Sequence, residues 1–135
     1  MDTFKLHPNL SSKDFITELK LCLVLFEDNK NFPWIFLVPK RNVKNMLGLT
    51  TEERLDLMRE IEVCEKAMFK IFKPDQTNIA MLGNKTPALH VHIICRKEGD
   101  INWPDSPFSA PVIKYTSEEK LEVIEKIKKS VLGGI

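Results

Sequence analysis

Hydrophobic residues in the first part of this chain are grouped in segments of strand length. Two apolar runs, residues 19–26 and 34–38, are rich in residues that favour extended backbone. The polar sequence EDNKNFP lies between them, which predicts an antiparallel hairpin. Pro39 follows the second run and ends it, because proline has no backbone N–H to contribute to a sheet.

The clearest helical pattern covers residues 51–73. Thr50 and Glu53 have the spacing of a capping box, and Pro74 ends the segment. Apolar residues recur every three or four positions and predict one buried stripe, formed by Leu57, Ile61, Cys64, Met68 and Phe72. A helix of this length can cross a whole small sheet.

The second half of the chain again has strands followed by a helix. Residues 77–84 and 88–96 are predicted strands, and residues 97–115 form a long irregular loop with three prolines. Thr116 and Glu119 have capping-box spacing at the start of a closing helix. The order β-β-α-β-β-α predicts an α+β fold with an antiparallel sheet, a long helix packed across it and a C-terminal helix.

Length and charge narrow the class of protein. With 135 residues the chain is expected to form a single domain, 1–135, and its 43% hydrophobic and 29% charged residues are typical of a globular fold. The formal net charge is +1, so neither nucleic acid nor an anionic membrane is expected as the main partner. No apolar segment approaches the roughly 20 residues of a membrane-spanning helix, and we expect no signal peptide.

The three cysteines, Cys22, Cys64 and Cys95, lie far apart in apolar segments. An odd number without a C-x-x-C pair argues against a disulfide framework or a zinc ribbon. We therefore expect reduced thiols and a cytoplasmic location.

The sequence LHVHIICR places two of the three histidines one residue apart in a predicted strand. Side chains alternate between the two faces of a strand, so one face carries His90, His92, Ile94 and Arg96. The intervening residues are all apolar, and we expect them to pack into the core. Because same-face neighbours lie about 6.6 Å apart, both imidazoles can line one small pocket.

Three interpretations of this histidine pair remain open. The two rings can be hydrogen-bonded structural residues. They can bind a metal ion, but a zinc site needs a third protein ligand, and the one other histidine, His7, lies in a different context. They can also act on a phosphate, because a neutral imidazole is a nucleophile that forms a covalent phospho- or nucleotidyl-histidine.

The segment LGNKTP before the strand favours phosphate chemistry. Gly83 permits unusual backbone geometry, and the side chains of Asn84 and Thr86 can donate hydrogen bonds to phosphate oxygens. Arg96, on the histidine face, adds a further donor. We therefore expect an anionic phosphate ligand, with no bound metal and no cofactor.

The composite motif LGNKTPALHVHIICRKEGDINWP, together with WIFLVPKR and the long helix, resembles the histidine triad (HIT) superfamily. It is most similar to a bacterial HIT-like branch of the form LGN-x-x-P-x-LHVHVIAR-x-x-GD-x-x-WP, and the resemblance covers most of the chain. It implies an antiparallel sheet that carries the histidine strand, and two subunits that pair as a homodimer. It also implies nucleotide hydrolases and nucleotidyl transferases that act at an α-phosphate without a metal in the chemistry.

In the full family motif, His-φ-His-φ-His-φ-φ, the middle histidine is the nucleophile and the first one orients it. By this resemblance the two roles fall to His92 and His90. The third position is Ile94, which cannot donate a proton, and Asn42 stands where a further family histidine is common. The motif is thus an incomplete triad, HxHxxxR. One hypothesis is that Arg96 compensates by stabilising charge on a leaving phosphate. The alternative is an arginine that forms an ion pair at the surface.

Two further positions have two interpretations each. Asp28, at the end of the first hairpin strand, is a ribose ligand by the resemblance or else a turn residue. Trp103 either covers a ligand or fills the core beneath its loop.

The main expectation is a nucleotide phosphohydrolase or nucleotidyl transferase that attacks the α-phosphate of a purine nucleoside phosphate through a nucleotidyl-histidine intermediate on His92. Diadenosine polyphosphates and nucleoside phosphoramidates are the expected types of substrate. The alternative is a nucleotide-binding or protein-interaction module with little or no catalysis. Ile94 supports this alternative, because general acid catalysis contributes about 10²- to 10⁴-fold to a rate.

Overall fold

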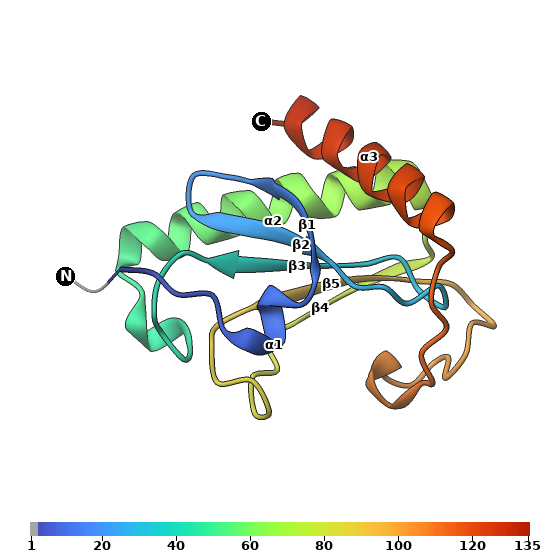
Figure 1. Cartoon of the computed structure of the whole chain (residues 1–135), viewed down its shortest axis with the longest axis horizontal. Helices are drawn as coiled ribbons and strands as arrows, with labels where there is room; N and C mark the ends of the chain where they lie inside the picture. The colour runs from blue at the N-terminus through green and yellow to red at the C-terminus, as the bar shows by residue number, and fades with distance from the viewer. Residues whose placement is uncertain (1–2) are drawn as a thin grey trace.

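The computed structural model describes residues 3–135, which form one five-stranded antiparallel sheet and three α-helices (Figure 1). The strands are β1 (Asp14–Glu18), β2 (Cys22–Phe26), β3 (Trp34–Pro39), β4 (Gln76–Ala80) and β5 (Val91–Arg96). The helices are α1 (Pro8–Ser11), α2 (Thr51–Phe72) and α3 (Ser117–Gly133), with short 3₁₀ turns η1 (Met46–Gly48) and η2 (Pro107–Ser109) in the connections. The strand order is β1-β2-β3-β5-β4, so β5 lies between β3 and β4.

The predicted hairpin is present as β2 and β3, which pair with Cys22 opposite Pro39. The predicted strand start at residue 19 is wrong, because the chain turns there and the Leu19 N–H donates to the Cys22 carbonyl. The preceding strand, β1, was not predicted. Its sequence, DFITE, buries the adjacent residues Ile16 and Thr17 and contains a bulge, so it lacks regular alternation of apolar and polar residues.

α2 begins where the sequence predicts and ends within one residue of the predicted end. The Thr50 side chain accepts a hydrogen bond from the Glu53 N–H, and the Glu53 carboxylate accepts one from the Thr50 N–H. The last helical residue is Phe72, after which Lys73 adopts a left-handed backbone conformation, with φ of 46°. α3 begins with a second complete capping box, also as predicted.

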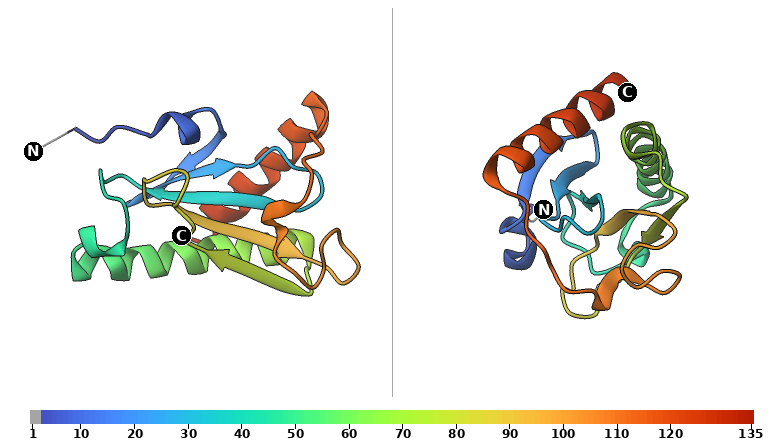
Figure 2. Two further views of the ribbon diagram at one scale, coloured as in Figure 1. Left: turned by 90° about the horizontal axis from the view of Figure 1, so that it is seen from below. Right: turned by 90° about the vertical axis from the view of Figure 1, so that its right-hand side faces the viewer.

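The two long helices cover one face of the sheet, and irregular segments cover the other (Figures 1 and 2). In Figure 1, α3 lies above the sheet and α2 runs behind β1 and β2, whereas α1, the loop after β4 and the loop after β5 lie towards the bottom of the view. The main hydrophobic core lies between the helices and the sheet and includes Val91, Ile93 and Cys95 of β5. A smaller cluster, hereafter the second hydrophobic cluster, contains Leu10, Leu25, Phe32, Trp34, Phe36, Val38 and Ile94. The predicted α+β fold, with a long helix across an antiparallel sheet, is confirmed.

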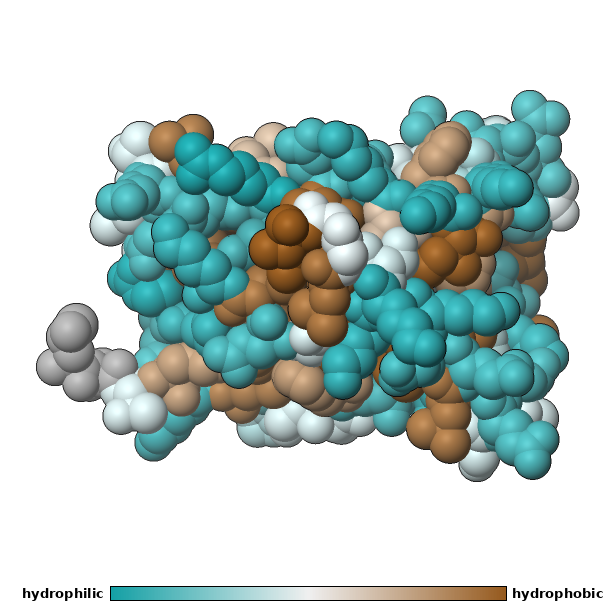
Figure 3. All heavy atoms as spheres, turned by 90° about the horizontal axis from the view of Figure 1, so that it is seen from above, coloured by the Kyte–Doolittle hydropathy of each residue, from teal (hydrophilic) through white to brown (hydrophobic). Residues whose placement is uncertain are grey.

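The outer surface of the long helices is mostly hydrophilic, with a smaller group of hydrophobic side chains near its centre (Figure 3). Between residues 3 and 135, no helix combines the length and the apolar composition needed to cross a membrane. Cys22, Cys64 and Cys95 are free and buried. Burial raises the pKa of Cys64 and of Cys95 to about 12, so both thiols stay protonated at neutral pH.

A candidate functional site at the histidine pair

β5, an inner strand beside the edge strand β4, positions the histidine pair. His92 pairs with Phe36 of β3 and with Ala80 of β4, and His90 immediately precedes the strand. The alternation predicted from the sequence is observed, because the intervening residues pack into the main core. The histidine face is covered as well, since His90 and His92 are only 5% and 7% exposed. The polar atoms of both rings therefore need hydrogen-bond partners.

His90 is fixed by the backbone of its own segment. Its Nδ1 lies 2.7 Å from the carbonyl oxygen of Ala88. A carbonyl oxygen only accepts hydrogen bonds, so Nδ1 of His90 carries the hydrogen. In the neutral ring, Nε2 of His90 then has a free lone pair.

His92 is fixed by side chains of the neighbouring strand and of the loop after β5. The indole N–H of Trp34 donates to its Nδ1 over 3.1 Å. Its ring packs edge to face against Phe36 and Phe108, each at a centroid distance of 5.0 Å, and against His90 at 4.9 Å. Among residues 3–135, Nε2 of His92 is the one buried side-chain nitrogen or oxygen without a hydrogen-bond partner. Such an atom points to a missing ligand or to a chemical role.

The environment keeps His92 uncharged at neutral pH. Burial is the main cause that lowers the pKa of His92 to about 4, and electrostatic repulsion from His90 is the next. The positive charge of Lys13 acts in the same direction, whereas a backbone interaction with Leu82 opposes it. At neutral pH the ring can therefore offer a lone pair on one nitrogen and a hydrogen on the other.

A cleft of about 350 Å³ opens beside both rings. Its lining comes from the sheet, the loop after β4 and the N-terminal segment, and comprises Asn9, Leu10, Ser12, Lys13, Glu27, Phe36, Lys85, Thr86, His90 and His92. The Nδ2 amide of Asn9 donates to Thr86 Oγ1 over 3.0 Å and joins α1 to the loop. Lys13 pairs with Glu27 at 2.9 Å and lies over the Phe36 ring. Glu27 partly neutralises Lys13, so Lys85 is the lysine of the cleft lining that adds positive charge beside the aromatic ring of Phe36.

The contribution of the N-terminal segment was missed from the sequence. Asn9 and Lys13 precede the histidines by about eighty residues, and nothing in their sequence indicates that they dock on the histidine strand. The local signals are limited to the start of α1, where His7 Nδ1 accepts from the Asn9 N–H and Pro8 occupies the first helical position. These signals predict a helical turn and not its position in space.

Of the six residues predicted for the site, the structure brings three to the cleft: His90, His92 and Thr86. Asn84 is exposed in the same loop as Thr86 and does not line the cleft. Asp28 accepts a hydrogen bond from the Tyr115 N–H over 2.9 Å and lies 3.7 Å from Lys120 Nζ, at the start of α3. Arg96, on β5, also lies apart from the cleft.

Arg96 follows the predicted strand face but does not point toward the histidines. Its guanidinium makes two bonds of 2.8 Å to the Asp100 carboxylate and donates to Asn78 Oδ1 and to the Asp105 carbonyl. It also stacks against the rings of Phe32 and Trp103. The expectation that Arg96 lines the histidine pocket is therefore corrected: its donors are occupied by protein acceptors. Trp103 is half-buried, lies against the Arg96 guanidinium and does not line the cleft.

The two departures from the full motif have structural partners of their own. Ile94 is fully buried in the second hydrophobic cluster, opposite Trp34 of β3. Asn42 binds the N-terminal segment, because its Oδ1 accepts from the Lys5 N–H and its Nδ2 donates to the Thr3 carbonyl, each over 2.9 Å. Ile94 thus packs with the residues that cover the histidine face, and Asn42 holds the N-terminal segment.

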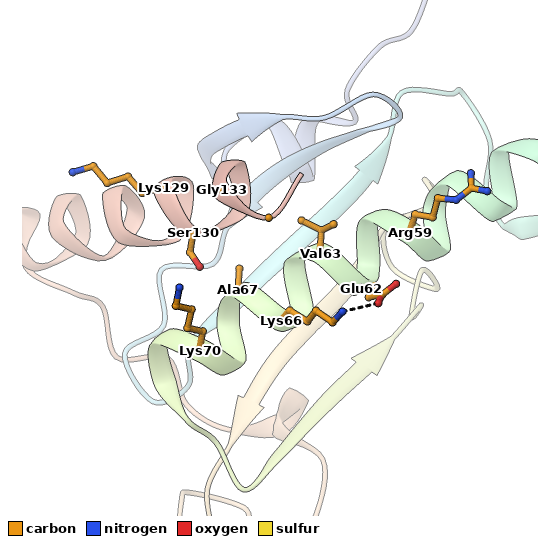
Figure 4. Close-up of a pocket in the computed structure, with 10 residues that line it drawn as sticks. Arg59, Glu62, Val63, Lys66, Ala67, Lys70, Lys129, Ser130 and Gly133 are labelled. Carbon is orange, nitrogen blue, oxygen red and sulfur yellow. Dashed lines mark hydrogen bonds and ion pairs between the residues drawn. The ribbon is translucent and has the colours of Figure 1, made fainter.

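A larger groove, of about 450 Å³, lies between α2 and α3, on the opposite side of the sheet (Figure 4). Its charged lining includes Arg59, Lys66, Lys70 and Lys129. Lys66 is neutralised in part by Glu62, at 2.8 Å. In the part of the chain that the structure describes, no three His, Cys, Asp or Glu side chains are grouped as metal ligands would be. The unpartnered imidazole nitrogen therefore makes the smaller cleft the better candidate site.

Comparisons with known protein families and curated proteins identify two similarities. A family model described as "HIT domain" matches residues 10–99. A curated relative from Schizosaccharomyces pombe, an asymmetrical bis(5'-nucleosyl)-tetraphosphatase, is 30% identical over 80 residues. The alignment covers 56% of this chain and 44% of that relative, so the chain spans less than half the length of the curated relative it matches.

Solved structures of two histidine triad proteins are similar over nearly the whole chain. The protein from Marinobacter aquaeolei VT8 has a TM-score of 0.94 and 31% identity, covering 99% of this chain and 100% of that one. The protein from Bradyrhizobium japonicum has a TM-score of 0.92 and 33% identity, covering 96% of this chain and 99% of that one. The similarity therefore includes the sheet, the long helices and the segments that cover the histidines.

Proposed function

The chain belongs to the HIT domain family, and from this premise we propose that it is a nucleotide phosphohydrolase or nucleotidyl transferase acting at an α-phosphate. The observation that carries the proposal is Nε2 of His92, a buried nitrogen without a protein partner on an uncharged ring beside a cleft. Such an atom is available to a phosphate ligand. The name of the Schizosaccharomyces pombe relative, a nucleosyl tetraphosphatase, supports a nucleotide substrate.

In the proposed reaction, His92 Nε2 attacks the α-phosphorus of a diadenosine polyphosphate or a nucleoside phosphoramidate. The N–P bond forms while the bond from phosphorus to the leaving oxygen or nitrogen breaks, and its electron pair departs with the leaving group. For Nε2 to attack, the ring hydrogen must reside on Nδ1. Water then cleaves the N–P bond, which releases the nucleoside monophosphate and restores the histidine. His90, packed edge to face on His92, keeps that ring in orientation.

Thr86 and Asn84 are the proposed ligands of the phosphate oxygens. Thr86 Oγ1 already accepts a hydrogen bond from Asn9, so its own hydroxyl hydrogen is free to donate into the cleft. Asn84 would reach the phosphate from the same loop. Lys85 supplies positive charge at the cleft for an anionic ligand.

A nucleotide-binding module without turnover is the second candidate, and Ile94 favours it. This side chain is buried in the second hydrophobic cluster and cannot protonate a leaving group. The absence of a general acid slows a reaction by about 10²- to 10⁴-fold without removing the ligand site.

Trapping of the intermediate separates the two candidates. The protein is incubated with diadenosine tetraphosphate or a nucleoside phosphoramidate, quenched in alkali to preserve N–P bonds, and digested. Mass spectrometry then locates any nucleoside monophosphate adduct. Turnover together with an adduct on His92, both lost in His92→Gln, supports the enzyme.

Two controls make this test decisive. His7→Asn keeps a capping acceptor for α1, lies outside the cleft, and is expected to form the adduct normally. Calorimetry measures nucleotide binding in parallel. Binding without turnover or adduct supports the module, and the absence of binding and of turnover contradicts both candidates.

We further propose that the protein forms a homodimer through the edge strand β4. The side chains of Ile79, Met81 and Leu82, at and just after this strand, are 41%, 43% and 47% exposed. Pairing two β4 edges would cover these side chains and satisfy backbone groups that are otherwise open to solvent. The free cysteines support the proposed cytoplasmic location.

A further inference from the structure

Trp34 is held rigidly beside His92. It lies in β3, is 5% exposed, and packs against Phe32, Phe36 and Phe108 at centroid distances of 6.3, 6.3 and 5.6 Å. Its ring meets the His92 ring edge to face at 5.7 Å. The position of the indole N–H is therefore set by packing on several sides, and it does not follow movements of the histidine.

The hydrogen bond from Trp34 decides which nitrogen of His92 carries the hydrogen. An indole N–H can only donate, so Nδ1 of His92 must accept and has no hydrogen of its own. In the neutral ring the hydrogen then resides on Nε2, the nitrogen without a protein partner. His90 has the opposite tautomer, because its Nδ1–H donates to the Ala88 carbonyl. The cleft therefore has a hydrogen donor on His92 beside a ring with a free lone pair on His90.

We infer that Trp34 is a positioning residue that holds His92 in the tautomer unable to attack phosphorus, so that the Trp34–His92 hydrogen bond restrains covalent chemistry at this site. The inference rests on the proposed function, in which Nε2 is the attacking atom. In the resting tautomer, the Nε2–H of His92 donates a hydrogen bond to a phosphate oxygen of the bound nucleotide. Attack requires the hydrogen to reside on Nδ1, where the indole N–H of Trp34 lies.

The effect of Trp34 on the tautomer equilibrium of His92 is that of one hydrogen bond between neutral groups. The net contribution of such a bond corresponds to about a two- to tenfold change in an equilibrium between two states. Removing the indole N–H is therefore expected to raise the population of the attacking tautomer by about two- to tenfold. The rate of adduct formation should rise by the same factor, because it is proportional to that population.

The tautomers can be measured in the unmodified protein. Nitrogen-15 NMR of the ring nitrogens distinguishes Nδ1–H from Nε2–H, and the three histidines can be assigned with His7→Asn and His92→Gln. We expect His92 as Nε2–H and His90 as Nδ1–H, so His90 is an internal reference. A wild-type His92 ring with the hydrogen on Nδ1 would overturn the inference, whatever the protein does to nucleotides.

Two variants remove the indole N–H of Trp34 in different ways. Trp34→Phe keeps an aromatic ring, and Trp103→Phe is the matched control because it removes the chain's other indole, which packs on Arg96 and not on His92. In the Trp103→Phe background, biosynthetic replacement of tryptophan by benzothienylalanine substitutes sulfur for the N–H at position 34 alone. This second variant keeps the shape of the side chain and guards against a folding defect in Trp34→Phe.

In both variants we expect a larger population of the His92 tautomer with the hydrogen on Nδ1. The rate of adduct formation should rise two- to tenfold. Trp103→Phe alone should leave the tautomer and the rate unchanged. An unchanged tautomer, or a slower adduct despite a changed tautomer, contradicts the restraint. If no protein forms an adduct, the proposed covalent function fails. The NMR spectra still decide whether Trp34 sets the tautomer, so the two failures are distinguishable.

Discussion

At the level of single residues, the charge state of His92 links the site to stability. Its pKa in the folded protein is about 4, because of burial and then of His90. A histidine in an unfolded chain has a pKa of about 6.5. Between these two pH values the unfolded chain binds a proton that the folded protein does not bind. The free energy of unfolding therefore decreases as the pH falls from 6.5 to 4, and the contribution is fully present above pH 6.5.

The first prediction concerns this pH dependence. The difference of roughly 2.5 pKa units corresponds to about 3 kcal/mol. Urea unfolding of wild type and of His92→Gln is measured at several pH values between 7 and 4. The free energy of unfolding of wild type should fall by about this amount, and this fall should be missing in the variant. His7→Asn should keep the wild-type slope. Parallel pH profiles of wild type and His92→Gln would contradict the lowered pKa.

Arg96 is the residue whose interpretation changes most. Its side chain is 2% exposed and forms an ion pair with Asp100, whose pKa is lowered chiefly by that hydrogen bond. The guanidinium is bound by the Asp100 carboxylate and by Asn78, and it packs against two aromatic rings. These contacts explain how its charge can be buried. Its position supports the loop after β5 and not a leaving phosphate.

The second prediction is that Arg96→Met lowers the free energy of unfolding by about 3–5 kcal/mol, because it leaves the Asp100 carboxylate without its partner. Chemical denaturation measures the loss. The matched control is Arg59→Met, which removes a largely exposed arginine that pairs with Asp56 and should leave the midpoint unchanged. If Arg96→Met keeps its stability but loses nucleotide affinity, Arg96 is a ligand after all.

At the level of elements, Glu60 joins the long helix to the sheet. This residue of α2 is buried, and its carboxylate accepts the N–H groups of Leu21 and Cys22 over 2.9 Å each. The Leu21 N–H lies in the turn between β1 and β2, and the Cys22 N–H lies at the first residue of β2. The bonds therefore fix the position of the helix against the strands that support the histidine face.

The third prediction concerns this link. Glu60→Gln replaces one acceptor oxygen by a donor and should cost about 1–3 kcal/mol, because one buried N–H loses its partner. Thermal and urea unfolding give the value. Glu62→Gln, two residues away on the exposed side of α2, should behave as wild type. Equal effects of both substitutions would rule out a specific role for Glu60.

At the level of the whole molecule, the proposed assembly concerns one edge of the sheet. β4 is the last strand in the order β1-β2-β3-β5-β4 and pairs on one side with β5. Because β5 carries His92, any chain that pairs with β4 lies one strand away from the site. The proposed dimer would therefore place the two histidine strands in one continuous sheet.

The fourth prediction is that wild type has the mass of a dimer by light scattering and Ile79→Lys that of a monomer. A lysine at an exposed strand edge disfavours pairing with another edge. Leu121→Lys, at an exposed position of α3, is the control and should remain dimeric. A monomeric wild type, or a dimeric Ile79→Lys, would place the assembly surface elsewhere.

Features that depend on neighbouring residues could be predicted from the sequence. Alternation along β5 separated the core face from the face of His90 and His92, because successive side chains of a strand point to opposite sides. Capping residues fixed the starts of α2 and α3, because a cap is completed within one helical turn. β1 escaped prediction because its alternation is interrupted by a bulge.

Long-range packing sets the other polar contacts of the site, apart from the local bond between His90 and Ala88. Trp34 reaches His92 across 58 residues of sequence because β3 pairs with β5, and Asn9 reaches Thr86 across 77 residues because α1 docks on the histidine face. Arg96 turns to Asp100 because the loop after β5 folds back. Such partners depend on how distant segments pack, and therefore the sequence identified the histidines but not the hydrogen bond from Trp34 to His92.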